Sequence, residues 1–237
     1  MIAQLKPFED SFYQMVFHKL KKIDVLVLCE GKTETELIKA LLNKMHKLET
    51  LKVIGITDCQ GINNIPQLTQ ALLSLIKLSR KLKTVAILID AETETPQNRI
   101  RMIMDSLKSR GIKISREPEK CCKQTYKTII SVNNKKVILI VSISGIFTTP
   151  KERHTIEDHI VKLIGEQKVR ENKSRLLEVT LKVLEKADVK KLKQAFPHIY
   201  CMFINIFKEY KILQELNNVI DETLEVLEEK LRELSSL

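Results

Sequence analysis

The sequence lacks tryptophan altogether and contains only six glycines among its 237 residues. Aromatic residues make up 5% of the chain, and its five cysteines include no Cys-x-x-Cys pair. Scarce glycine excludes collagen-like and glycine-rich low-complexity chains, and the cysteine spacing matches no disulfide framework of a small secreted protein. The composition therefore favours a helix-rich α/β protein with a solid aliphatic core.

Long hydrophobic runs are also missing. The most apolar stretch, Val137–Pro150, is too short to span a bilayer, and the segment MIAQLKPFED lacks the apolar core of a signal peptide. We therefore expect no membrane contact and a cytoplasmic location. In that reducing compartment most of the cysteines are expected to be buried as small hydrophobic residues.

Basic residues are in excess, and they are unevenly spread. The net charge is +10, with 40 Lys and Arg against 30 Asp and Glu. Residues 215–237 contain seven acidic and two basic residues, so the preceding 214 residues carry +15. A basic body favours a polyanionic partner, with nucleic acid (DNA or RNA) first. The alternative is the solvated surface of a thermophilic protein, which the abundance of Lys, Glu, Ile and Leu also favours.

Two aliphatic runs organise the chain. The stretches Asp24–Glu34 (DVLVLCEGKTE) and Thr84–Glu92 (TVAILIDAE) begin with β-branched and aliphatic residues, which is typical of buried parallel strands. A third, strongly β-branched run at Val137–Ser144 is expected at the centre of the sheet. Segments of helical spacing alternate with these runs. The sequence therefore predicts an α/β fold with a Rossmann-like, mostly parallel sheet over residues 1–165.

The character of the chain changes after Gly165. Residues 166–237 are almost wholly helical by pattern, which predicts a helical C-terminal extension for oligomerisation or partner binding. The apolar cluster at Phe196–Tyr210 predicts either a satellite core or a dimer interface. Leucine spacing from Leu213 resembles a short coiled-coil seam, so a homodimer through these helices is one expectation.

Turn and capping signals suggest where loops and helices meet. Thr95-Pro96 predicts an N-cap followed by a first-turn proline, and Arg99 is expected on the surface of the helix that follows. Thr149-Pro150 predicts the start of another helix, which runs to about Ile164. The pair Cys121-Cys122 is expected in a loop.

Carboxylates follow the first two predicted strands. Glu30 and Glu34 come after one, and Asp90 and Glu92 come after the other. Because ligand sites in open α/β sheets lie beyond the carboxyl ends of the strands, these four side chains are expected along one edge. Like charges this close repel unless a cation or a shared proton intervenes. Residues two apart in an extended segment face the same side, so Asp90 and Glu92 can face one ion, and oxygen ligands favour Mg²⁺ or Mn²⁺.

Structural explanations for the same residues remain open. Glu34 lies in the first turn of the expected helix, where the helix dipole favours an acid. Glu30 lacks such an explanation, because a buried charge directly after an apolar strand is costly without a partner. A further alternative is a thermophilic Rossmann-like protein whose acidic residues pair with lysines.

The acidic motifs together resemble the Toprim domain. They are Glu30-Gly31 after one strand, a glycine-bearing loop at Gly61, and Asp90-Ala91-Glu92 after a later strand. The resemblance covers roughly residues 23–164. The family's usual Asp-x-Asp is Asp-x-Glu in this chain, and the longer glutamate arm changes the geometry with which it reaches a metal.

Two details place the resemblance within that superfamily. The form Glu30-Gly-Lys-Thr-Glu34 is similar to the overcoming-lysogenization-defect nucleases, where the later acid also binds metal. Ile156-Glu157-Asp158 is similar to a late element of small stand-alone archaeal Toprim-like proteins.

The resemblance implies a metal-dependent phosphodiester enzyme that acts on nucleic acid, most closely a nuclease. It implies Mg²⁺ or Mn²⁺ ligands at five acidic residues: Glu30, Glu34, Asp90, Glu92 and Glu157. It also implies that Glu30 takes part in proton transfer and that Lys32 stabilises charge in the transition state. The alternative is a non-catalytic nucleic-acid-binding Toprim module within a larger DNA or RNA processing complex.

Overall fold

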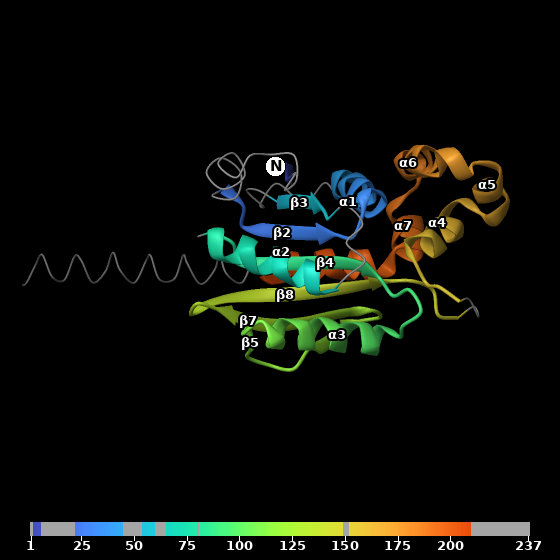
Figure 1. Cartoon of the computed structure of the whole chain (residues 1–237). Helices are drawn as coiled ribbons and strands as arrows, with labels where there is room; N and C mark the ends of the chain where they lie inside the picture. The colour runs from blue at the N-terminus through green and yellow to red at the C-terminus, as the bar shows by residue number, and fades with distance from the viewer. Residues whose placement is uncertain are drawn as a thin grey trace, which may run out of the picture.

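The structure is a computed structural model that describes residues 2–5, 22–44, 54–59, 65–79, 81–148 and 152–209. Helices cover both faces of one mixed, mostly parallel sheet (Figure 1). The predicted α/β fold is therefore confirmed. The predicted loop glycine Gly61 and the leucine spacing beyond Leu213 lie outside the described residues.

The strands are β1 (Ile2–Leu5), β2 (Val25–Cys29), β3 (Ile54–Asp58), β4 (Thr84–Asp90), β5 (Lys113–Ile114), β6 (Glu119–Cys122), β7 (Thr125–Val132) and β8 (Lys135–Ser144). The helices are α1 (Lys32–Lys44), α2 (Ile65–Leu78), α3 (Pro96–Ser109), α4 (Ile156–Ile164), α5 (Glu166–Glu171), α6 (Leu176–Lys186) and α7 (Val189–Ala195). A short 3-10 helix spans Lys173–Arg175, and residues 197–209 are also helical.

The strands lie in the order β1-β3-β2-β4-β8-β7-β5, and β6 also pairs with β7. The first five of these strands are mutually parallel, whereas β7 runs antiparallel to β8, β5 and β6. β8 lies between β4 and β7, which confirms its predicted central position. Cys29 lies opposite Leu88, and Asp90 lies opposite Ser144. The carboxyl ends of β2, β4 and β8 therefore meet at one end of the sheet.

Alternating side chains of each central strand enter two separate cores. In β2, Leu26 and Leu28 pack in the cluster that includes α2 and α3, while Val25, Val27 and Cys29 pack in the cluster of the opposite face. Helices α1, α4, α6 and α7 contribute to that second cluster, and Figure 1 shows the two sets of helices on either side of the sheet. Burial on both faces explains why these strands are continuous apolar runs.

The apolar segment that begins at Phe196 completes the second core. Phe196, Ile199 and Phe203 are fully buried and belong to the same cluster as Val27 of β2 and Ile140 of β8. This packing is neither a satellite core nor a dimer interface, so the expectation for these side chains was wrong. The division of the chain at residue 165 and a homodimer stay predictions.

Helix α4 begins later than the sequence predicts. It starts at Ile156 with Thr155 as N-cap, and its predicted end at Ile164 is confirmed. The predicted start at Thr149-Pro150 lies outside the described residues, whereas residues 152–155 are described and are not helical. The physical reason is a tertiary contact, because the backbone N–H of Ile156 donates a hydrogen bond to Asp90 Oδ1 over 2.9 Å. The predicted cap and proline of α3 are confirmed, since Thr95 Oγ1 accepts from the N–H of Asn98.

The predicted loop around Cys121 and Cys122 is instead strand β6, which pairs with β7. Cys122 forms a disulfide with Cys201, and their Cα atoms lie 6.4 Å apart. The bond joins β6 to the helical segment at residues 197–209. The sequence did not indicate this pairing, because 79 positions separate the two cysteines. Of the helices described in the chain, none has the length and apolar character needed to cross a membrane.

Candidate functional site

Glu30 links the ends of the two strands that the sequence singled out. Its backbone N–H donates to Leu88 O of β4 over 3.1 Å. Its carboxylate in turn accepts a hydrogen bond at Oε2 from the N–H of Asp90 over 3.0 Å. Glu30 is only 6% exposed. The side chain therefore reaches from the end of β2 to the last residue of β4, as expected of a site at the carboxyl ends of parallel strands.

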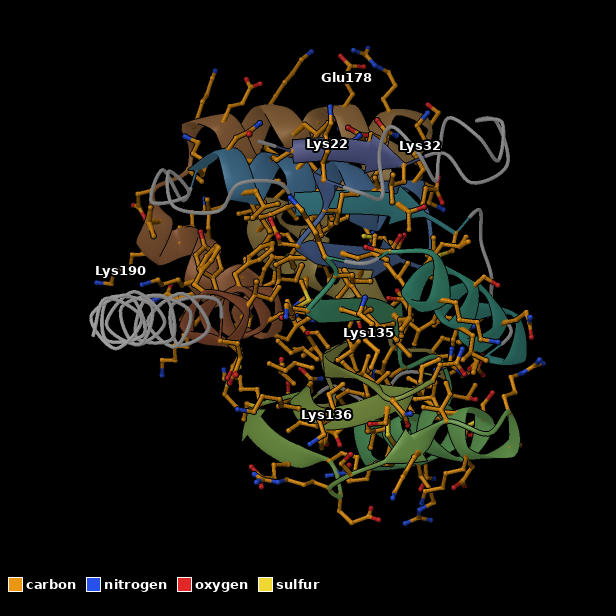
Figure 2. All side chains as sticks on the ribbon, turned by 90° about the vertical axis from the view of Figure 1, so that its left-hand side faces the viewer. Lys22, Lys32, Lys135, Lys136, Glu178 and Lys190 are labelled. Carbon is orange, nitrogen blue, oxygen red and sulfur yellow. A yellow bond between two sulfur atoms is a disulfide. The ribbon has the colours of Figure 1, made fainter. Side chains whose placement is uncertain are left out.

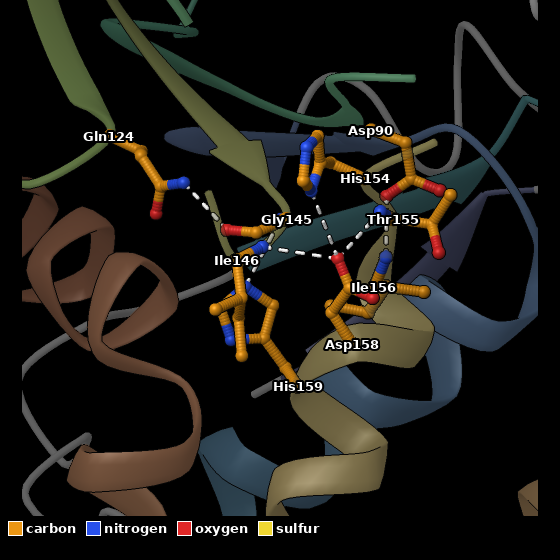
Figure 3. Close-up of polar contacts among 9 residues, drawn as sticks. All are labelled: Asp90, Gln124, Gly145, Ile146, His154, Thr155, Ile156, Asp158 and His159. Atoms are coloured by element: carbon orange, nitrogen blue, oxygen red, sulfur yellow. Dashed lines mark hydrogen bonds and ion pairs between the residues drawn. The ribbon is translucent and has the colours of Figure 1, made fainter. Parts of the chain in front are cut away.

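Asp90 joins β4 to the start of helix α4. Its Oδ1 accepts the hydrogen bond from the N–H of Ile156, the first residue of that helix (Figure 3). Burial raises the pKa of Asp90 to about 9, and the charges of Glu34, Glu30 and Glu157 add to the rise against the opposing effect of the Ile156 hydrogen bond. At neutral pH Asp90 therefore holds a proton unless a cation replaces it.

Glu34 lies in the first turn of α1 and is 5% exposed. Burial, helped by the charges of Glu157 and Glu30 and opposed by two backbone hydrogen bonds, raises its pKa to about 7. A Cβ atom on Gly31 would lie 3.1 Å from Glu34 Oε2. The glycine of the Glu-Gly motif thus leaves room for the Glu34 carboxylate beside the turn.

Arg99 is the cation that opposes the negative charge of Glu30. Burial raises the pKa of Glu30, together with the charges of Glu92 and Glu157, whereas the Asp90 hydrogen bond and the Arg99 guanidinium lower it. Arg99 is 8% exposed, so its predicted surface position was wrong. Its Nε makes no hydrogen bond within the described part of the chain. The missed signal was its position one turn before Ile103, on the buried stripe of α3.

Glu92 does not share the extended geometry that the sequence suggested. Strand β4 ends at Asp90, and Glu92 has a φ of 57°. Its backbone pairs with His154, and its carboxylate accepts a hydrogen bond from Arg153 Nε. Because the backbone turns here, alternation no longer applies to this pair. Glu92 still contributes to the raised pKa of Glu30.

Two further predicted site residues, Glu157 and Lys32, are exposed. Glu157 is exposed in the first turn of α4, yet its charge raises the pKa of Glu30, Glu34 and Asp90. Lys32 is the exposed first residue of α1. The structure therefore gathers three buried carboxylates, with Glu157 close enough to act on each of them.

The donor chemistry of this acidic cluster (Glu30, Glu34 and Asp90) fits a hard divalent cation, because Mg²⁺ and Mn²⁺ prefer carboxylate oxygens. One oxygen of Glu30 and one of Asp90 are held by backbone N–H groups, which orients both carboxylates. Across the described ranges, however, no three Asp, Glu, His or Cys side chains are already arranged to hold a metal ion. Sharing one ion would require these side chains to turn closer together.

A polar network that the sequence did not identify continues from Asp90 to the end of β8 (Figure 3). The N–H of Ile146 donates to Asp158 Oδ2, and the N–H of Gly145 donates to His159 Nε2, both over 3.1 Å. Gly145 has a φ of 131°, and a Cβ there would lie 2.5 Å from His154 Cβ, so the position requires glycine. This network fixes the β8–α4 connection beside the acidic cluster.

His159 is a neutral, structural part of that network. Because Nε2 accepts from Gly145, Nδ1 carries the proton and donates to Ala195 O over 2.8 Å. Burial lowers the pKa of His159 to about 4. The imidazole therefore stays uncharged at neutral pH and joins α4 to α7.

Comparison with known proteins assigns the chain to a family. Residues 24–201 match the family described as "Protein of unknown function (DUF3226)", and the chain belongs to this family. No curated protein and no solved structure matches the chain. The matched range contains the acidic cluster, the network around His159 and the helices as far as Cys201.

Proposed function

We propose that this protein is a metal-dependent enzyme acting on nucleic-acid phosphodiesters, and specifically a nuclease of the Toprim type. The observation that carries the proposal is the acidic cluster, in which burial and the charges of neighbouring carboxylates raise the pKa of every member. Such a cluster is relieved by protons or by a cation. Its place beyond the carboxyl ends of β2 and β4 is where open α/β sheets bind ligands.

The residues would have different roles in metal binding and in phosphate stabilisation, according to their positions. Glu30 and Asp90, each oriented by a backbone N–H, and Glu34 on α1 would hold Mg²⁺ or Mn²⁺. When bound, the ion would neutralise charge on a phosphodiester and lower the pKa of a bound water. Lys32, exposed at the start of α1, is placed to stabilise charge on the phosphate. A net charge of +10 suits a nucleic-acid substrate, DNA or RNA.

A second candidate function is a nucleic-acid-binding module without turnover, within a larger processing complex. The observation that favours it is the lack of a ready-formed set of three metal ligands in the ranges the structure describes. Under this alternative Asp90 keeps its proton and the acidic cluster has a structural role. The basic charge would then supply binding alone.

A cleavage assay separates the two candidates. We expect the full chain with Mn²⁺ or Mg²⁺ to cut DNA or RNA oligonucleotides, and Glu30→Gln and Asp90→Asn each to lower the rate by about a thousandfold, which corresponds to about 4 kcal/mol of transition-state stabilisation. Both changes keep the shape of the side chain while removing a negative ligand.

Matched controls lie on exposed surfaces away from the cluster. Asp105→Asn on α3 and Glu117→Gln beside β6 remove the same charges from exposed positions and should leave the rate unchanged. Undiminished cleavage in both site variants would contradict the nuclease assignment. Binding of nucleic acid with no cleavage under any metal condition would favour the second candidate.

A further inference from the structure

A cavity of about 540 Å³ lies at the same end of the sheet as the acidic cluster. Gly145 and Ile146 line it, and these are the residues that the Asp158–His159 network fixes beside Asp90. Gly145 directly follows Ser144, which lies opposite Asp90 in the sheet. Anything bound in this cavity would therefore lie next to the proposed catalytic site.

The charge around the cavity is uniformly positive. Lys120 comes from β6, Lys123 from the turn between β6 and β7, and Lys162 from α4, and all three are exposed. None of the described lining residues is acidic. The first turn of the 14-residue helix α3 also lines the cavity and adds the positive end of its dipole. Three cations from separate elements around one hollow favour an anionic ligand such as a phosphate.

The β6–β7 hairpin that carries two of these lysines is held in place. Gln124 Nε2 donates a hydrogen bond to Gly145 O over 2.6 Å (Figure 3). The disulfide of Cys122 with Cys201 ties the same hairpin to the helical segment behind it. Lys120 on β6 and Lys123 in the following turn are thus carried by an anchored hairpin that contacts the β8–α4 connection.

Phe147 supplies an aromatic surface at the rim. Its side chain is 37% exposed and lines the cavity, although large apolar side chains of this protein are mostly buried. The imidazole of His154 packs against its ring, with centroids 4.4 Å apart. An exposed aromatic ring beside a positively charged groove is the arrangement on which proteins stack unpaired bases.

We propose that this cavity binds one nucleotide of a single-stranded nucleic acid, with its phosphate at Lys120, Lys123 and Lys162 and its base on Phe147. The proposal rests on the proposed function for its substrate class, and it goes further by naming the single strand and the subsite. A strand held here would leave its neighbouring phosphodiester beside Glu30 and Asp90. A free mononucleotide carries the same phosphate and base, so the test includes both ligands.

The test measures the binding of a labelled single-stranded oligonucleotide to the full chain. Fluorescence anisotropy reports the binding, in EDTA and at a series of salt concentrations. We expect the triple variant K120Q/K123Q/K162Q to bind at least about tenfold more weakly. For this variant, the logarithm of the association constant should fall less steeply with the logarithm of the salt concentration. The slope should be less negative by about 0.7 for each lost phosphate contact.

A matched triple variant controls for overall charge. K22Q/K83Q/K136Q removes three exposed lysines at the opposite end of the sheet, where β2, β4 and β8 begin. Figure 2 views that end and labels Lys22 and Lys136 there. This variant should bind within about twofold of the wild-type chain. Equal losses in the two triple variants would overturn the subsite, because binding would then follow net charge alone.

Phe147 gives an independent readout. Phe147→Ala should weaken binding about tenfold at every salt concentration without changing the slope, while Phe147→Tyr should retain it, because stacking depends on the ring and not on charge. If Phe147→Ala weakens the binding of a duplex as much as it weakens the binding of the single strand, the single-strand assignment is overturned. Mononucleotide binding as tight as oligonucleotide binding would overturn the assignment to a strand.

Because these measurements omit metal, they are separable from the proposed catalysis. If binding meets these expectations but the protein cleaves no nucleic acid, the subsite is supported and the nuclease function is rejected. Cleavage that is unaffected by the lysine and Phe147 variants would reject the subsite and retain the nuclease.

Discussion

The acidic cluster and the lysine-lined cavity are neighbours that carry opposite charge in opposite environments. Glu30, Glu34 and Asp90 are 5–8% exposed, and their hydrogen bonds come from the backbone. Lys120, Lys123 and Lys162 are exposed to solvent. Buried charges couple proton and ion binding to folding, whereas exposed charges act through a field that salt screens. The cluster should therefore respond to pH and divalent ions, and the cavity to ionic strength.

The largest effect that tests this difference is expected in the free energy of unfolding, measured as a function of pH without metal. The pKa of Asp90 is about 9 in the folded chain and about 4 when unfolded. Between those values the folded state keeps a proton that the unfolded state has released, so the free energy of unfolding falls as pH rises. Glu34 adds to the fall up to its pKa of about 7. We expect the wild-type chain to lose several kcal/mol over this range, since one pKa unit is worth about 1.4 kcal/mol.

Urea denaturation in EDTA at several pH values measures this slope. Asp90→Asn removes one titrating group and should flatten the curve, most clearly above about pH 7, where the contribution of Glu34 has ended. Asp105→Asn, an exposed aspartate on α3, should keep the wild-type slope. Parallel curves for the wild type and Asp90→Asn would show that Asp90 is not the buried, protonated group described here.

A smaller effect is expected at the disulfide that anchors the cavity's turn. Cys122→Ser should lower the free energy of unfolding by about 2–4 kcal/mol under non-reducing conditions, because the bond closes a long loop in the unfolded chain. Its neighbour Cys121 is free and half-buried, so Cys121→Ser is the matched control with little expected change. Equal midpoints for the two variants in urea would mean that the bond contributes nothing to stability.

Much of the fold could be predicted, because central strands and amphipathic helices leave local patterns. The runs that became β2, β4 and β8 are continuous and apolar since both faces of the sheet are covered. Thr95-Pro96 marked the start of α3 correctly for an equally local reason. Strand β6 (EKCC) has no apolar pattern and exists through its pairing with β7, so the sequence placed a loop there.

Features of the site that depend on tertiary contacts were harder to predict. The sequence predicted a helix start at Thr149-Pro150, whereas α4 starts at Ile156, whose N–H contacts Asp90. Proximity of Glu30, Glu34 and Asp90 was expected because the carboxyl ends of parallel strands lie along one edge of a sheet. Arg99 was placed on the surface although its spacing from Ile103 puts it on the buried stripe of α3. The carboxylate that its charge opposes, Glu30, follows a different strand, so no local pattern shows that partner.

The most direct test of the central claim is calorimetric titration of the full chain with Mn²⁺, at neutral pH, in two buffers of different ionisation enthalpy. We predict saturable binding with release of about one proton or more per ion, because Asp90 and part of Glu34 must lose protons to become ligands. Asp90→Asn should abolish this binding, while Asp105→Asn should preserve it. The absence of saturable binding, or equal binding by wild type and Asp90→Asn, would contradict a metal site at the ends of β2 and β4.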